Sequence, residues 1–151
     1  MTVSTQVDFY LLAEGSPHAR DLFVCRLVEK AHRLGHAILL LISDQPQRAK
    51  LDALLWSFRA ESFLPHGEQM ADEGQRIFLD DRIRLDRCDD LLINLTDALP
   101  GGFVGFNRVA EIVTSDPLQR ELSRQRFRAY RQAGIQPVTH DLTGETRPQP
   151  R

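Results

Sequence analysis

Two apolar runs constrain the fold of this chain more than any other feature. Ala37 to Ile42 is a continuous apolar run, and Leu91 to Leu95 is interpreted as a second strand of the same kind. A strand that is apolar along its length has both faces buried, which is typical of a parallel sheet covered by helices. The first run is also far shorter than the ~20 residues that a membrane-spanning helix needs.

Helical spacing and capping residues place three helices between and after the strands. The predicted helices run from Ser16-Pro17 to Leu34, from Ser43-Asp44 to about Phe58, and from Asp116-Pro117 to Gly134. A polar cap followed by proline is typical of a helix start, and glycine of a helix end. Four more strands are predicted, at Val7 to Leu12, Ile77 to Leu79, Val109 to Val113 and Val138 to Leu142.

This alternation predicts an α/β fold, with a mainly parallel sheet and helices on both faces in three layers. The pattern leaves the strand order open. Residues 1–142 are expected to form a single domain. The last nine residues, TGETRPQPR, hold two prolines, one glycine and no large apolar side chain. Residues 143–151 are therefore predicted to be a mobile tail.

Charge and cysteine content narrow the functional classes. The formal net charge is −2, so a general polyanion binder is not expected and any basic site must be local. Two cysteines, Cys25 and Cys88, cannot form a disulfide scaffold and suit a reducing compartment. The amino terminus lacks the positive flank and the cleavage site of a secretion signal. A cytoplasmic protein without a membrane segment is expected.

Motifs for cofactors, metals and catalysis are missing from the sequence. No phosphate-binding glycine motif follows the first strand. The single glycine-rich loop, Gly101 to Gly105, is interpreted as a tight connection, with an anion cradle or an unrecognised enzyme site as the alternative. His32 and His36 are separated by Gly35, which ends the helix, so they are not expected to share a metal. We therefore expect no catalytic residue, no cofactor and no metal.

The third predicted helix carries a concentration of positive charge. Between Asp116 and Gly134, five arginines accompany two acidic residues, a net charge of +3. At 100° per residue, the face expected to pack on the sheet consists of Leu118, Leu122, Ala129 and Ala133. The opposite side carries Phe127 among four of the arginines, Arg120, Arg124, Arg128 and Arg131.

Three interpretations of this basic face stay open from residue types alone. Arginine forks beside an aromatic ring suit an acidic peptide that also carries an aromatic residue. The same groups suit a nucleic-acid backbone with one stacked base. The third interpretation is a solvated helix face on which arginine stems cover Phe127.

The second helix presents a possible interface anchor. Leu51, Leu54, Leu55 and Phe58 form its inward stripe, and Trp56 points about 150° away from them by helical geometry. An outward tryptophan is typical of a protein interface, although cover by the chain itself is the alternative. Phe63 could extend the same apolar surface.

The sequence resembles the chi subunit of the bacterial DNA polymerase III holoenzyme over nearly the whole of residues 6–135. The clearest matching segments are DFYLL, LLWSFRAESFLPH, DLLINL and RFRAYRQAG, at residues 8–12, 54–66, 90–95 and 126–134. Residues 66–89 match poorly. The resemblance implies a Rossmann-like fold without a nucleotide site, in an accessory protein that is not an enzyme.

The resemblance also implies two protein partners on different surfaces. One is a psi-like subunit of the clamp loader, with the family's aromatic contact positions falling on Trp56 and Phe63. The other is the acidic carboxyl-terminal tail of single-stranded DNA-binding protein, with the family's binding positions falling on Arg120, Arg124, Phe127 and Arg128. Contact with DNA would then be mainly indirect.

Overall fold

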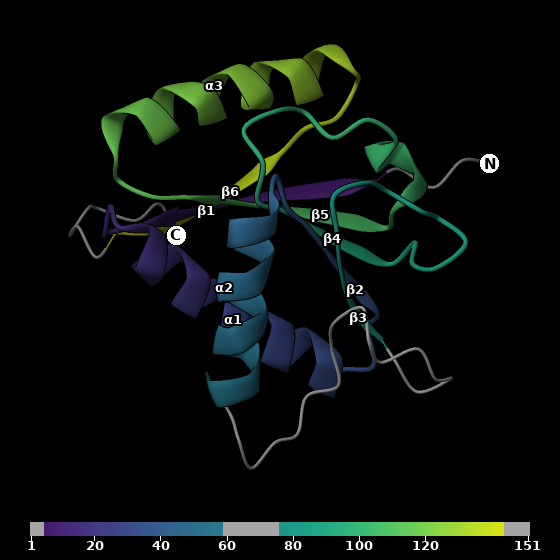
Figure 1. Ribbon diagram of the computed structural model, residues 1–151. Coiled ribbons are helices and arrows are strands. Elements are labelled where there is room, and N and C mark those ends of the chain that lie inside the picture. The colour runs from purple at the N-terminus through teal and green to yellow at the C-terminus, as the bar shows by residue number, and fades with distance from the viewer. Residues whose placement is uncertain (1–4, 59–75, 144–151) are drawn as a thin grey trace.

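In the computed structural model, which describes residues 5–58 and 76–143, six parallel strands form one sheet (Figure 1). The spatial order is β3-β2-β4-β5-β1-β6, and every adjacent pair is parallel. In chain order the strands are β1 (Gln6–Leu12), β2 (Ile38–Leu41), β3 (Ile77–Asp80), β4 (Leu91–Asn94), β5 (Arg108–Val113) and β6 (Val138–Leu142). The predicted α/β fold with a parallel sheet is confirmed.

Three helices cover the two faces of this sheet. The helices are α1 (Pro17–Arg33), α2 (Gln45–Phe58) and α3 (Pro117–Gln132). Figure 1 shows α1 and α2 on one face and α3 on the other. The first two helices join strands that step toward the β3 edge, whereas α3 joins β5 to β6 at the opposite edge. Connections of one hand that step in opposite directions place their helices on opposite faces, which explains the three layers.

The helix starts lie where the capping residues predict them. The side chain of Ser16 accepts a hydrogen bond from the backbone N–H of Ala19 at 3.0 Å, and the first residue of α1 is Pro17. The carboxylate of Asp44 caps α2 in the same way, accepting from the N–H of Gln47 at 2.9 Å. These side chains satisfy N–H groups that have no partner within the helix.

Two hydrophobic cores lie on the two faces of the sheet. One core fills the space under α1 and α2, and its fully buried members include Val24, Val28, Leu51, Leu55 and Ile93. The other lies under α3 and under the connection before β5, and includes Phe9, Leu92, Phe103, Phe106 and Tyr130. Successive residues of β4 enter opposite cores, which is why its sequence lacks the alternation of a half-exposed strand.

Some predictions fall outside the residues that the structure describes. They concern the place of Phe63 on the outer surface and the mobility of residues 144–151. Among the described helices, none combines the length and the apolar character required to cross a membrane.

Candidate functional site

The basic helix α3 starts at a well-formed cap. The Asp116 carboxylate accepts a hydrogen bond from the N–H of Gln119 at 3.0 Å, and Pro117 is the first helical residue. At the other end, Gly134 has φ +89°, a left-handed conformation that suits glycine after a helix. The predicted extent of this helix is therefore confirmed.

The face of α3 that packs on the sheet differs from the predicted one. Leu118, which was expected to face the sheet, is 64% exposed, and Ala133 is also exposed. The buried residues of the helix are Ser123, Arg126 and Tyr130. The prediction was wrong for Leu118 and Ala133, whereas Leu122 and Ala129 are half-buried. It ranked positions by hydrophobicity alone. What lies beneath the helix is a buried carboxylate, which selects polar partners.

That carboxylate belongs to Glu111, in the middle of β5, whose side chain is fully buried. It accepts hydrogen bonds from Arg126 Nε at 3.0 Å, Tyr130 Oη at 2.7 Å and Asn94 Nδ2 at 2.9 Å. Arg126 also donates from Nη1 to the carbonyl of Asp97 at 3.2 Å. A buried charge requires such a set of partners. This network therefore holds α3 against β4 and β5 and fixes the rotation of α3 about its own axis.

Burial and charge act together on the ionisation of this network. Burial raises the pKa of Glu111, while the Arg126 guanidinium and the hydrogen bonds from Asn94 and Tyr130 act to lower it. Burial also raises the pKa of Tyr130, and the charge of Glu111 raises it further. The raised pKa keeps the Tyr130 phenol protonated, so its hydroxyl donates the hydrogen bond to Glu111.

Sequence reasoning missed this network, although a signal was present. Asn94 interrupts the run from Leu91 to Leu95, and Glu111 interrupts the run from Val109 to Val113. A polar residue in a strand buried on both faces needs a partner from another element. The remaining arginine of α3, Arg126, is that partner and is not part of the exposed basic face.

Phe127 lies at the border between the buried and the exposed sides of α3. Its side chain is half-buried, packs on the core under the helix, and lies 5.1 Å from the ring of Phe9 between ring centroids. The expectation of a ring on the solvent side was therefore only partly right. The part of Phe127 that stays accessible forms an apolar border beside the arginines.

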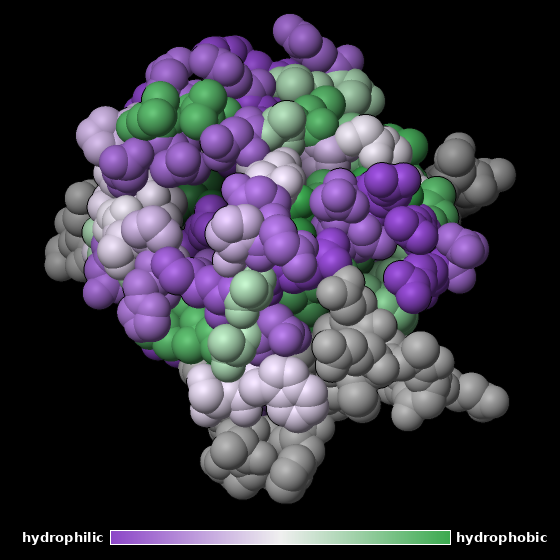
Figure 2. Space-filling model, in the orientation of Figure 1, coloured by the Kyte–Doolittle hydropathy of each residue, from purple (hydrophilic) through white to green (hydrophobic). Residues whose placement is uncertain are grey.

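The four remaining arginines of α3 form one row along the helix. Their spacing of four, four and three residues places them as neighbours on successive turns. Arg124, Arg128 and Arg131 are exposed, whereas Arg120 is half-buried and donates from Nε to the carbonyl of Thr114 at 3.1 Å. Figure 2 shows mainly hydrophilic side chains along α3, with hydrophobic patches between them. We define this row, together with Phe127, as the basic row.

Little negative charge opposes the basic row. Arg124 lies 3.2 Å from the carboxylate of Glu121, with both side chains largely exposed. Within residues 5–58 and 76–143, Arg128 and Arg131 make no ion pair with an acidic side chain. Such exposed guanidinium groups keep their donors available for a carboxylate ligand.

The predicted outward tryptophan on α2 is confirmed. Trp56 is 51% exposed, while Leu51 and Leu55 on the opposite side of the helix are buried and Leu54 packs against the same core. The side chains of Phe58 and Phe63, which were expected to join the inward stripe and the outer surface respectively, lie outside the described residues. Because α2 and α3 cover opposite faces of the sheet, Trp56 and the basic row lie on different layers (Figure 1).

The glycine-rich loop has structural roles that require no ligand. Gly102 has φ +90°, and a Cβ added to Gly105 would lie 2.6 Å from Leu85 Cδ1. Phe103, between these glycines, is buried in the core under α3. The loop thus needs glycine at Gly102 for a left-handed turn, and Leu85 packs closely over Gly105, as expected for a tight connection.

His36, Asp80 and Asp90 take part in local contacts. His36 Nδ1 lies 3.1 Å from a carboxylate oxygen of Asp90, and Asp80 pairs with Arg84 at 3.1 Å. Across the described part of the chain, no three His, Cys, Asp or Glu side chains are grouped closely enough to hold a metal ion.

Comparison with known proteins gives consistent matches over most of the chain. The family model described as DNA polymerase III chi subunit, HolC, matches residues 4–138. The DNA polymerase III subunit chi of Pseudomonas aeruginosa is 42% identical over 138 residues, which cover 91% of this chain and 97% of that protein. The subunit chi of Escherichia coli K12 is 32% identical over 136 residues, covering 84% and 91% respectively.

Proposed function

This chain belongs to the family of DNA polymerase III chi subunits, and from that premise we propose that it links two protein partners during DNA replication. It is a non-catalytic accessory subunit. The basic row of α3 binds the acidic carboxyl-terminal tail of single-stranded DNA-binding protein. The surface around Trp56 binds a psi-like subunit of the clamp loader. Because bacterial DNA replication takes place in the cytoplasm, the protein acts there.

The observation that carries this proposal is the separation of the two surfaces. The basic row lies on α3 and Trp56 lies on α2, with the whole sheet between the two layers. A linking subunit must hold both partners at once, and surfaces on opposite layers let each partner bind without contact with the other. Sites that share no residues are also expected to act independently.

The chemistry of the basic row suits an acidic tail that ends in an aromatic residue. Arg124, Arg128 and Arg131 supply exposed guanidinium groups, each able to bind a carboxylate through two parallel hydrogen bonds. The accessible part of Phe127 supplies an apolar surface for an aromatic side chain. Arg120 stands at the start of the row, but its bond to the Thr114 carbonyl already uses one donor.

Charge reversal in the basic row is expected to weaken tail binding. Arg124→Glu and Arg128→Glu should each reduce the affinity for a short acidic peptide by at least about tenfold, or ~1.4 kcal/mol. Each change removes a donor fork and adds repulsion. Fluorescence anisotropy of a labelled peptide at several salt concentrations measures the effect. Arg33→Glu, at an exposed position of α1, is the matched control; an equal loss in that variant would mean that only overall charge matters.

The terminal carboxylate of the tail is expected to be read by an arginine. If the last aromatic residue packs beside Phe127, its α-carboxylate lies within reach of the row. Amidating that carboxylate should therefore cost a charge-assisted hydrogen bond and weaken binding about tenfold. Competition titrations with the free and the amidated peptide compare the two. Equal affinities would show that the arginines contact internal acidic residues of the tail instead.

Direct binding of single-stranded nucleic acid through the same arginines is the second candidate. The half-burial of Phe127 against Phe9 counts against it, because base stacking needs an open ring face. A titration with a single-stranded oligonucleotide beside the tail peptide separates the two candidates. Tail binding predicts tighter association with the peptide than with the oligonucleotide at physiological salt, because arginines on one helix can neutralise only a few phosphates.

A further inference from the structure

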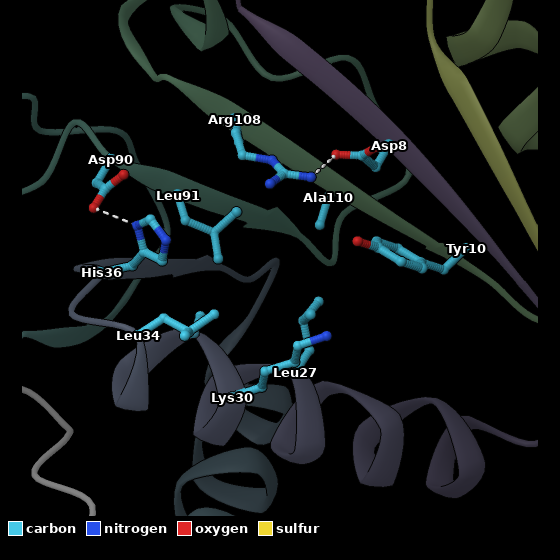
Figure 3. Close-up of a pocket in the computed structure, with 11 residues that line it drawn as sticks. Asp8, Tyr10, Leu27, Lys30, Leu34, His36, Asp90, Leu91, Arg108 and Ala110 are labelled. Carbon is cyan, nitrogen blue, oxygen red and sulfur yellow. Dashed lines mark hydrogen bonds and ion pairs between the residues drawn. The ribbon is translucent and has the colours of Figure 1, made fainter.

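A separate cavity lies on the face of the sheet that α1 and α2 cover, at the amino-terminal ends of the strands. It has a volume of about 150 Å³ and opens between the carboxyl-terminal half of α1 and strands β1, β4 and β5. Figure 3 shows side chains of the strands facing side chains of α1 and its cap residue across this space. Neither the basic row nor Trp56 lines the cavity, so it is not part of the surfaces assigned above.

The floor of the cavity is apolar. Ala31, Leu91 and Ala110 are buried beneath it, and Leu27 is half-buried. Leu34, at the rim, is 67% exposed. An exposed leucine beside an apolar cavity enlarges the surface from which an aliphatic ligand would displace water.

The acidic groups of the cavity already have partners. Asp8 accepts hydrogen bonds from Arg108 Nη2 and pairs with His140 Nε2, each at 2.9 Å. Asp90 accepts from the backbone N–H of Ala37 at 3.1 Å and pairs with His36 at 3.1 Å. The strongest acceptors of the cavity are therefore occupied within the protein.

Among the described residues, two polar side chains of the cavity have no hydrogen-bond partner, and both can donate. In the part of the chain that the structure describes, neither the Lys30 ammonium nor the Tyr10 hydroxyl has a hydrogen-bond partner. Arg108 uses one nitrogen for its bond to Asp8, although a guanidinium carries five N–H groups. A ligand that uses these donors supplies acceptors, and the charge of Lys30 favours an anionic group beside it.

The volume decides between a metabolite and a single side chain. Pockets for small-molecule ligands are typically ~300–1,000 Å³, about two or more times larger than this cavity. We propose that the cavity binds one aliphatic side chain of a protein partner. A carboxylate next to that side chain in the partner pairs with the Lys30 ammonium. This third protein-binding site does not depend on the functions proposed for α3 and Trp56.

N-acetyl-leucine tests this proposal because it joins an aliphatic side chain to a carboxylate. Titrated into the ¹⁵N-labelled full chain, it should shift the backbone amide signals of Leu27, Lys30, Leu34 and Arg108 in a saturable way. N-acetyl-leucinamide, which lacks the carboxylate, should bind about fivefold more weakly, a difference typical of one exposed ion pair. Equal affinities for the two probes, or shifts confined to α3, would overturn the proposal.

Variants of exposed residues locate the two parts of the ligand without disturbing the core. Lys30→Met should abolish the difference between the two probes, and Lys30→Arg should restore it. Leu34→Glu should eliminate binding of both probes. Lys50→Met, at an exposed position of α2 outside this cavity, is the matched control and should change nothing. Retention of the difference between acid and amide in Lys30→Met would show that Lys30 does not bind the carboxylate.

Discussion

Glu111→Ala is expected to lower the free energy of unfolding by about 3–5 kcal/mol, the typical cost of breaking a buried ion pair from one side. The fully buried carboxylate pairs with Arg126 and accepts hydrogen bonds from Tyr130 and Asn94. Its removal leaves a guanidinium, a phenol and an amide without their shared partner. Urea denaturation followed by circular dichroism measures the loss.

Two further variants make this prediction specific to burial. Glu121→Ala removes a glutamate from the surface of α3, where it pairs with Arg124 at 3.2 Å. It should cost no more than about 1 kcal/mol, as exposed ion pairs do. Glu111→Gln keeps the shape and removes the charge, so it provides a measurable intermediate if Glu111→Ala fails to fold. Equal stability of the Glu111→Ala and Glu121→Ala proteins would show that the network does not hold α3 in place.

Trp56→Ala is expected to abolish co-purification with the psi-like subunit. A tryptophan that becomes desolvated in an interface typically contributes about 2 kcal/mol or more to binding, which corresponds to roughly a 30-fold loss of affinity. Trp56 is 51% exposed in the free protein, so its truncation should leave folding nearly intact. Tail-peptide affinity should also be unchanged, because the basic row lies on the opposite layer.

The control for Trp56→Ala is another exposed apolar side chain. Val104→Ala removes a residue that is 66% exposed in the connection before β5, and it should leave both interactions unchanged. Thermal unfolding of both variants shows whether folding is affected. A large drop in melting temperature for Trp56→Ala, with partner binding preserved in the folded fraction, would place the psi-like interface elsewhere.

Local features of the sequence predicted the elements and part of the candidate sites. Ser16, Asp44 and Asp116 cap their helices because a short polar side chain reaches N–H groups only two or three residues away. The arginine row and the outward Trp56 follow from the constant 100° rotation per helical residue. Such features depend on neighbours in the chain, and the sequence contains those neighbours.

Contacts between segments that are distant in the sequence could not be predicted from such local patterns. Apolar runs predict that both faces of a strand are covered, but they contain no information on which strand lies beside it. The order β3-β2-β4-β5-β1-β6 follows from how the helices pack and from the direction of each crossover. The cavity beneath Leu34 likewise depends on three strands and a helix meeting at one edge.

The rotation of α3 is the feature that only the tertiary structure decided. Ranking by hydrophobicity predicted that Leu118 faces the sheet. In the structure Leu118 is exposed, and Arg126 and Tyr130 are buried against the sheet. Their partner Glu111 lies 15 and 19 residues earlier in the chain, so no local pattern reveals the pairing. The sequence by itself determined that four arginines of α3 lie in one row, because helical spacing requires it. The half-burial of Phe127 was decided by the tertiary structure. The buried Glu111 carboxylate requires polar partners, and the pairing with Arg126 and Tyr130 fixes how α3 is turned toward the sheet.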